Sequence, residues 1–390
     1  MGGAATGGAR VAGARCEVYR WILPRPIGDA NGTTDRLDLA FTTVTTDGGE
    51  TGHALGGSPS AIEHLAGLLD GADPHQTRAL ARLLRGAAFK EGVGGARWQA
   101  AAALENALWD LKGKLLGLPL WRLLGAGSRR VPLYGSGLGA GLDVDDLSAV
   151  YRNFAARGIT AAKVKVGAGD ARSELARVEA VAAAVTDTGR RLDGLMIDLN
   201  EHLTTKAAVS LANRIHRSFP LLWVEEPAAR DDLRELRWAR DHLDSNLATG
   251  ENLASARELL RIVDAGACDV IQLGGQLSIG DALTVSEAAA AAGVPASVVS
   301  GEGHALAHVA AAAGHTAPYE LKFLEPPPFL EVDHVVEDGH LRLSDTPGVG
   351  FRLGRDADAF IAASQPDPAP VAGPHHRLGP RLKTPPGTTE

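Results

Sequence analysis

The pattern of apolar and polar positions changes near residue 130, and the first part of the chain predicts a mixed unit of strands and helices. Two segments between Val11 and about Glu50, EVYRWILPRP and LDLAFTTVTTDGGE, have the composition of strands. Between them, PRPIGDANGTTD (residues 24–35) predicts a polar loop, because it is rich in Gly, Pro and Asn. Residues 60–124 follow a helical period, with one apolar stripe formed by Leu104, Leu108, Leu111 and Leu115.

Beyond residue 130, short apolar runs alternate with helical segments. Eight such runs occupy residues 131–137, 161–166, 192–200, 221–226, 246–251, 268–273, 294–300 and 319–324. Strands that alternate with helices at this spacing predict βα units and a parallel sheet. Eight strands in one continuous stretch fit a closed barrel.

Composition excludes several classes of function. Of the 390 residues, 45% are hydrophobic, which is enough for a large core, and the formal net charge of −8 argues against a nucleic-acid partner or an anionic membrane surface. No apolar run approaches the ~20 residues of a membrane span. The two cysteines, Cys16 and Cys268, predict neither a disulfide framework nor a metal site. We therefore expect a cytoplasmic protein with no membrane partner.

The run AAKVKVG (161–167) places two lysines in a segment that otherwise has the composition of a buried strand. Residues two apart share one face of a strand, so Lys163 and Lys165 point the same way. A lysine is almost never fully buried unless it is paired. Acidic partners are therefore expected on the same side of the barrel wall.

Carboxylates follow three successive strands. Asp198, Glu225 and Glu251 lie 27 and 26 residues apart, which is one βα unit each, so they should occupy equivalent places at the carboxyl ends of the strands. Active sites of such barrels lie at that end. Three converging carboxylates need a counter-ion, and oxygen-only ligation suits Mg²⁺. Glu320 lies in the eighth strand, whereas Glu226 is expected to face away and pair outside the barrel.

The motifs in this order resemble the enolase superfamily, specifically the mandelate racemase and muconate lactonizing enzyme group. ALWDLKGKLLGLPLWRLLG (107–125) is similar to the junction between capping domain and barrel, and KVK, IDLN, VEEP and GEN are similar to the catalytic and metal motifs. The resemblance covers about residues 14–355. It implies a modified (β/α)7β TIM barrel at 131–324, and an α+β capping domain at 11–130 to which 325–355 returns. Residues 1–10 and the Pro-rich tail 365–390 are expected to be flexible.

The resemblance also implies roles for single residues. Mg²⁺ would be held by Asp198, Glu225 and Glu251 and would engage a small carboxylate substrate. Lys165 is the expected base that removes the adjacent α-proton to give an enediolate. Lys163 is expected to touch the carboxylate and, with the metal ion, to lower the pKa of the base.

Three further expectations follow from the same resemblance. Glu320 would hydrogen-bond the substrate carboxylate. Asn200 matches a position that contacts substrate. The assembly would be a homo-oligomer.

The sequence departs from the family where racemases carry a second base. Gly274 stands at the strand-six position, and the strand-seven histidine position falls on Ser300 or, with a slip of one residue, on Val299. Glu302 and His304 lie just beyond and are candidates to substitute for it, Glu302 also as a substrate contact.

A site with one base favours dehydration of a hydroxy acid or acid sugar, because one lysine can remove the α-proton and then protonate the leaving hydroxyl. The alternatives are an epimerase or racemase, a cycloisomerase, or a non-catalytic relative. Loops around residues 24–35 and 54–60 are expected to close over the barrel mouth and set specificity. Arg25, Asp29 or Asn31 would then contact polar groups of the substrate.

Overall fold

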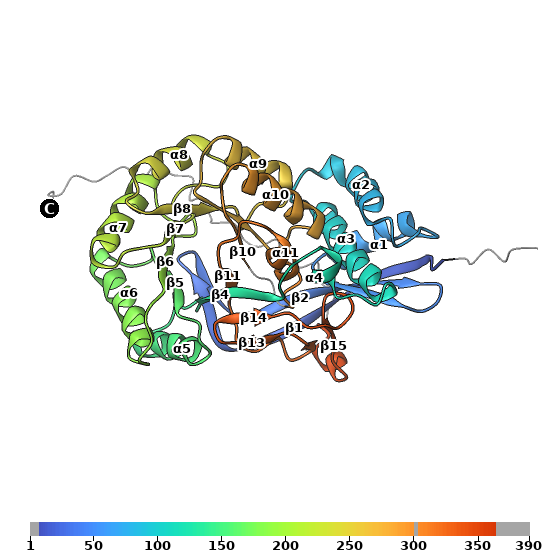
Figure 1. The fold of residues 1–390 in the computed structure, drawn as a ribbon, viewed down its shortest axis with the longest axis horizontal. Coiled ribbons are helices and arrows are strands. Elements are labelled where there is room, and N and C mark those ends of the chain that lie inside the picture. Colours follow the sequence, from blue (N-terminus) through green and yellow to red (C-terminus); the bar gives the residue numbers. More distant parts are fainter. Residues whose placement is uncertain (1–7, 300–302, 364–390) are drawn as a thin grey trace, which may run out of the picture.

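The computed structural model describes residues 8–299 and 303–363 as two packed units (Figure 1). The expectations for residues 1–7, for Ser300 and Glu302, and for the tail 365–390 concern residues outside the described part of the chain. Within the described part, no helix has both the length and the apolar character needed to cross a membrane.

The N-terminal unit is a three-stranded antiparallel sheet covered by helices, and the sequence predicts two of these strands and the helical region. Its strands are β1 (Val11–Asp29), β2 (Gly32–Thr46) and β3 (Thr51–Leu55), in the order β1-β2-β3. Its helices are α1 (Pro59–Ala66), α2 (Thr77–Ala88), α3 (Ala96–Leu115) and α4 (Leu120–Leu123), with short 3₁₀ turns η1 (Gly67–Leu69) and η2 (Phe89–Glu91). Leu104, Leu108 and Leu111 of the apolar stripe of α3 are buried in the core of this unit, and the partly buried Leu115 packs against that core.

The expected loop at residues 24–35 was wrong, because β1 and β2 continue through it as a long hairpin. Asp29 pairs with Gly32, which leaves a two-residue turn. The register shifts between Ile22 and Ile27, where four residues of β1 oppose one residue of β2. Pro24 and Pro26 lie in this bulge, where the missing N–H groups cost no ladder hydrogen bond. Of the predicted loop at residues 24–35, only the two residues between Asp29 and Gly32 form a turn.

The second unit is the predicted barrel. Its eight parallel strands are β4 (Arg130–Ser136), β5 (Ala161–Lys165), β6 (Gly194–Asp198), β7 (Trp223–Glu225), β8 (Asn246–Thr249), β9 (Val270–Leu273), β10 (Ala296–Val298) and β11 (Tyr319–Leu321). They pair in chain order from β4 to β10, and β11 pairs with β4. A bridge between Ala296 and Thr316 closes the ring at β10.

Seven helices connect the eight strands, which gives the (β/α)7β order. They are α5 (Val144–Ala156), α6 (Ala171–Thr186), α7 (Thr205–Ser218), α8 (Leu233–His242), α9 (Ala256–Asp264), α10 (Ile279–Ala291) and α11 (Ala307–Ala312). Tyr134, Met196, Trp223, Ala248 and Val270 fill the barrel interior below the site. The expected fold class is confirmed.

After β11 the chain forms short strands instead of an eighth helix. These are β12 (Leu330–Val332), β13 (Val335–Glu337), β14 (His340–Arg342) and β15 (Phe351–Leu353), followed by η3 (Ala357–Phe360). β14 pairs with barrel strand β4, and Ile361 bridges to Tyr19 of the capping sheet. The part of the chain after β11 therefore contacts both units.

Two polar clusters fasten the capping unit to the rest. The buried carboxylate of Asp110 accepts hydrogen bonds from His53 N (2.7 Å), Val349 N (2.8 Å) and Lys114 Nζ (2.6 Å), and so joins the capping sheet, α3 and the C-terminal segment. Arg85 of α2 donates to Glu105 Oε2 and to Ser278 Oγ, both at 2.6 Å, which ties the cap to the start of α10.

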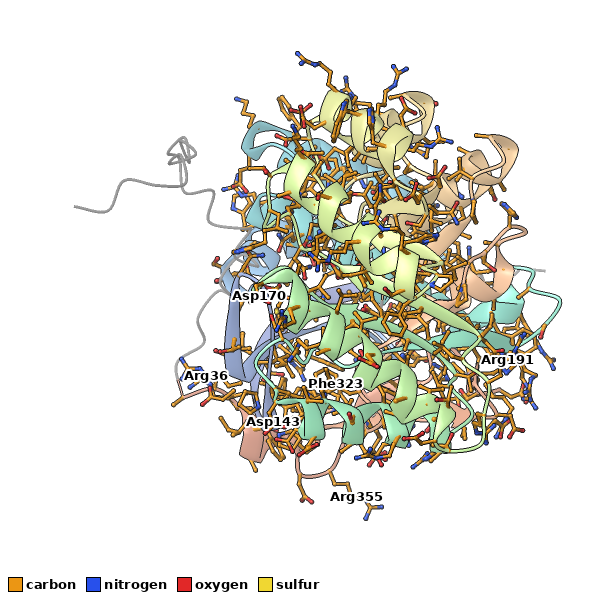
Figure 2. The ribbon with its side chains drawn as sticks, turned by 90° about the vertical axis from the view of Figure 1, so that its left-hand side faces the viewer. Arg36, Asp143, Asp170, Arg191, Phe323 and Arg355 are labelled. Carbon is orange, nitrogen blue, oxygen red and sulfur yellow. The ribbon has the colours of Figure 1, made fainter. Side chains whose placement is uncertain are left out.

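The hairpin tip extends from the cap to the mouth of the barrel (Figure 1). Gly28 N donates to Leu138 O at 2.8 Å, and Asn31 Nδ2 donates to Asn200 O at 2.9 Å. In Figure 2 the hairpin lies at the end of the barrel where Asp170 caps α6, whereas Arg191 lies at the opposite end. The cap therefore covers the carboxyl ends of the strands.

We expect Asp110→Ala to lower the free energy of unfolding by about 3 kcal/mol, because it leaves two buried N–H groups without an acceptor. Urea denaturation followed by circular dichroism measures the change. The exposed Asp264→Ala at the end of α9 is the matched control and should change stability by less than about 0.5 kcal/mol. Equal effects of the two substitutions would contradict the role of Asp110.

Candidate active site at the barrel mouth

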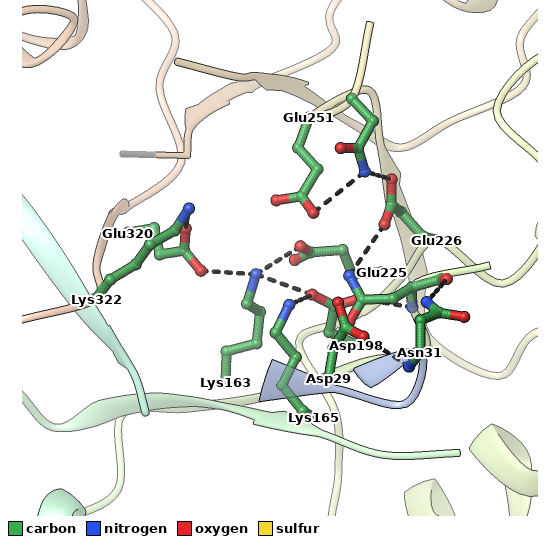
Figure 3. Close-up of polar contacts among 12 residues, drawn as sticks. Asp29, Asn31, Lys163, Lys165, Asp198, Glu225, Glu226, Glu251, Glu320 and Lys322 are labelled. Carbon is green, nitrogen blue, oxygen red and sulfur yellow. Dashed lines mark hydrogen bonds and ion pairs between the residues drawn. The ribbon is translucent and has the colours of Figure 1, made fainter. Parts of the chain in front are cut away.

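The predicted lysines and carboxylates meet at one place, at the carboxyl ends of the barrel strands (Figure 3). β5 carries both lysines. Asp198 ends β6, Glu225 ends β7, and Glu320 lies within β11. Their side chains are almost completely withdrawn from solvent. The register explains the meeting, since Lys165 pairs with Asp198 and Asp198 with Glu225 across neighbouring strands.

Glu251 reaches the same place from the loop after β8. The preceding Gly250 has φ of +125°, a conformation that other residues rarely adopt, and a Cβ there would lie 2.7 Å from Gln272 O. Glycine therefore permits the turn that directs Glu251 toward the mouth. One ligand oxygen from each of Asp198, Glu225 and Glu251 lies within 4.8 Å of the others.

This oxygen set fits a divalent cation. Opposite ligands of Mg²⁺ are separated by about 4.2 Å, twice the ~2.1 Å ligand distance, and the three oxygens span little more than that. Burial and the neighbouring Asp198 carboxylate raise the pKa of Glu225. A cation between these acids relieves both the burial of charge and the repulsion.

Lys163 is completely buried and contacts three carboxylates. Its Nζ lies 2.5 Å from Glu225 Oε1, 2.8 Å from Glu320 Oε1 and 3.2 Å from Asp198 Oδ2. Burial alone would lower the pKa of Lys163, but the carboxylates of Glu225 and Glu320 outweigh it and raise the pKa. The lysine therefore stays charged beside its acids.

Lys165 lies one layer nearer the mouth, with its Nζ 2.5 Å from Asp198 Oδ2. Burial and the neighbouring Lys163 ammonium lower its pKa, whereas Asp198 raises it, and among protein groups alone Asp198 prevails. The lowering by Lys163 agrees with the expectation from sequence, but it is the smaller effect. A cation that shares the charge of Asp198 weakens the opposing effect.

The expectation that Glu226 faces outside the barrel was wrong. Its side chain turns into the mouth. Its φ is +48°, so the alternation of a strand no longer applies after Glu225. The buried carboxylate accepts from Asn252 Nδ2 (2.8 Å) and Asn200 Nδ2 (3.3 Å). Burial, followed by the Glu251 carboxylate, raises the pKa of Glu226. The sequence contains no signal for this left-handed residue beyond the Pro227 that follows it.

The remaining predicted contacts divide into two groups. Asn200 lies in the cluster, between Glu226 and the hairpin residue Asn31, which also contacts His202. Arg25 is half-buried over the end of β4, where its Nη2 donates to Gly137 O at 2.7 Å. It is not among the carboxylates.

His304 lies on the far side of β11 from the cluster. Its Nδ1 is 3.0 Å from the hydroxyl of Tyr319, whose side chain alternates with the inward-facing Glu320. Burial, with a contribution from His334, lowers the pKa of His304 to about 3. Sequence position alone could not distinguish the two sides of the strand at this loop.

Two sequence profiles together cover most of the chain. The profile described as mandelate racemase / muconate lactonizing enzyme, N-terminal domain, matches residues 15–125. The profile described as enolase C-terminal domain-like matches residues 146–357. The two matches coincide with the capping unit and with most of the barrel.

Curated relatives are similar over most of their length. A 3,6-anhydro-alpha-L-galactonate cycloisomerase of Streptomyces coelicolor is 30% identical over 362 residues, which are 87% of this chain and 98% of the relative. An L-talarate/galactarate dehydratase of Salmonella typhimurium is 30% identical over 304 residues, 76% of this chain and 73% of the relative.

Solved structures agree with the fold. The L-talarate/galactarate dehydratase of Salmonella typhimurium LT2, liganded with Mg and L-lyxarohydroxamate, has a TM-score of 0.82 at 25% identity and covers 93% of this chain and 95% of its own. A racemase of Streptomyces coelicolor A3(2) with bound magnesium has a TM-score of 0.80 at 28% identity, with coverage of 90% and 100%.

We expect Glu251→Gln to weaken Mn²⁺ binding by at least about tenfold, because a neutral amide replaces one of three charged ligands. Titration followed by electron paramagnetic resonance measures the affinity. The exposed Glu287→Gln on α10 is the matched control and should bind Mn²⁺ as the wild type does. Unchanged affinity in Glu251→Gln would place the ion elsewhere.

Proposed function

Because this chain belongs to the enolase superfamily, in its mandelate racemase and muconate lactonizing enzyme group, we propose that its site abstracts the α-proton of a small carboxylate to form an enediolate. The chain is an enzyme of this group. One observation carries the proposal. Two lysines from one strand and carboxylates from its neighbours form a single buried cluster at the barrel mouth.

Asp198, Glu225 and Glu251 are the residues that would hold Mg²⁺. When bound, the ion supplies positive charge where the enediolate develops its negative charge. Lys163 and Glu320 together form the neighbouring end of the cluster, with their charged atoms 2.8 Å apart. Lys163 donates to the substrate carboxylate there, and Glu320 orients that lysine and accepts from a protonated or hydroxyl oxygen.

Lys165 is the base. Its Nζ is one layer closer to the mouth than that of Lys163, where the α-carbon of a carboxylate held by Lys163 comes to lie. The side chain is nearly buried, so water does not compete for its lone pair. Lys163 favours the neutral amine, because two ammonium groups repel each other.

Among the described residues, the strand-six position offers no base, and this favours β-elimination, the dehydration of a hydroxy acid or acid sugar. A Cβ at Gly274 would lie 1.8 Å from the carbonyl oxygen of Glu251, so that strand-six position has no room for a side chain. A 1,1-proton transfer, as in epimerisation, needs groups on both faces. Elimination needs a base on one face only, and the dehydratases among the relatives support this choice.

Cycloisomerisation is the second candidate. It also requires only one base, and the same blocked position at Gly274 favours it over epimerisation. The cycloisomerase of Streptomyces coelicolor matches 87% of this chain. A homo-oligomeric assembly and a cytoplasmic location stay predictions.

We expect Lys165→Met to lower α-proton exchange at least about 100-fold, because the base is lost. Galactarate, L-talarate and D-gluconate are the probes, and exchange in D₂O is followed by ¹H NMR with Mg²⁺ or with excess chelator. Chelation should abolish exchange by the wild type. Lys206→Met, an exposed lysine in the first turn of α7, is the matched control.

Two results would contradict the proposal. Exchange that persists in Lys165→Met would exclude this lysine as the base. A wild type that exchanges none of the three acids would favour the non-catalytic alternative.

A further inference from the structure

The protonation of the leaving oxygen has no assigned donor other than the base itself. The strand-six position is filled by backbone, because a side chain at Gly274 would collide with Glu251 O. His304 lies behind β11 and contacts the Tyr319 hydroxyl. Lys165 can return the proton that it removed, but it is held 2.5 Å from Asp198 Oδ2, which stabilises its ammonium form.

A third lysine stands beside the cluster. Lys322 follows Glu320 by two residues at the end of β11, just as Lys165 follows Lys163 on β5. Its Nζ lies 3.6 Å from Glu320 Oε2, and the other oxygen of that carboxylate contacts Lys163. Figure 3 shows the Lys322 side chain directed toward the Glu320 carboxylate.

Lys322 is the least enclosed of the three lysines. Its side chain is 27% exposed, against 5% for Lys165 and 0% for Lys163. Away from the clustered carboxylates, it also lines a cavity of about 340 Å³ on the side of β11 where His304 lies, together with Gly303 and Phe323. This ammonium is therefore held by one long ion pair and has open space in which to move and to exchange protons with water.

The arginines near the mouth cannot fill this role. Arg25 is held at Gly137 O, and Arg230 donates to Glu201 Oε1 at 2.7 Å. A guanidinium does not release its proton in proteins. An ammonium can donate a proton, and Lys322 places one beside Glu320.

We propose that Lys322 is the general acid that protonates the departing β-hydroxyl, an inference that rests on the proposed dehydration. The lone pair of Lys165 takes the α-proton, and the electrons of the C–H bond pass into the enediolate. Collapse of the enediolate forms the C–C double bond and breaks the C–O bond, whose electron pair leaves with oxygen. That oxygen takes a proton from Lys322 and departs as water. Lys322 then regains a proton from solvent, and Lys165 releases one.

Two substitutions at Lys322 distinguish a role in proton donation from a role of its positive charge alone. Lys322→Met removes the ammonium, and Lys322→Arg keeps a positive charge that cannot give up a proton. With galactarate, L-talarate and D-gluconate, we expect dehydration to fall at least about 100-fold in both variants. Exchange of the α-proton should stay within about threefold of the wild type. 2-Keto acid formation and ¹H NMR in D₂O measure the two rates.

The outcomes distinguish this inference from the proposed function. Full dehydration by Lys322→Arg would assign Lys322 a charge role only, and unchanged dehydration by Lys322→Met would exclude any role. A parallel fall of both rates would place its effect in binding or proton abstraction. Loss of exchange in the wild type itself would overturn the proposed function and this inference together. Lys206→Met should behave as the wild type throughout.

A second probe tests the step without a proton requirement. 3-Chloro-2-hydroxypropanoate loses chloride, which departs without protonation, after the same α-proton abstraction. We expect Lys322→Met to release chloride at the wild-type rate, which also shows that the variant is folded. A loss of chloride release as large as the loss of dehydration would overturn the assignment.

Discussion

The site depends on the balance between buried acids and buried amines. Asp198 and Glu225 are completely withdrawn from water, and carboxylates so placed repel one another and lose their hydration. Lys163 offsets this cost because its ammonium contacts both carboxylates. Lys165 contributes through its contact with Asp198. Neither side of the cluster is stable in the core without the other. The same balance makes the site responsive, because a divalent cation can replace the ammonium groups as the partner of the acids.

The capping unit places the tip of its β1–β2 hairpin beside this cluster of lysines and carboxylates. The hairpin tip is anchored through Asn31 to the backbone of Asn200, whose side chain in turn contacts Glu226. A chain of contacts therefore runs from the cap to a carboxyl group beside the proposed metal ligands. At the other end of the cap, Arg85 joins Glu105 to the start of α10. The cap is held at both ends of the barrel mouth, so its position over the site is set by specific polar contacts.

The sequence predicted the parts of the structure that depend on regular periods. Alternation of strands and helices identified all eight barrel strands, and the spacing of Asp198, Glu225 and Glu251 predicted their meeting, since equivalent positions of successive βα units meet at one rim. Departures from regular backbone could not be predicted. Glu226 turns inward because of one left-handed residue, and the segment 24–35 forms a hairpin because a bulge accommodates its prolines.

The side of the wall on which His304 lies also depends on tertiary packing rather than on a period. The direction in which the pKa of Lys165 moves is another quantity that composition does not reveal. It is decided by burial and the Lys163 ammonium, which lower the pKa, against the 2.5 Å contact with Asp198, which raises it. Irregular backbone and short-range electrostatics therefore mark the limit of inference from the sequence.

Burial also orders the lysines by the chemistry open to each. A fully enclosed ammonium among three carboxylates, as at Lys163, is suited to hold a charge in place and not to exchange protons. A nearly enclosed amine that touches only one carboxylate, as at Lys165, can be switched between its two forms by whatever else binds that carboxylate. A partly exposed amine on a single long ion pair, as at Lys322, can exchange protons with water between turnovers. The three proposed roles, in binding, proton abstraction and proton donation, therefore follow from the different exposure and the different number of acidic neighbours that the barrel wall gives each lysine.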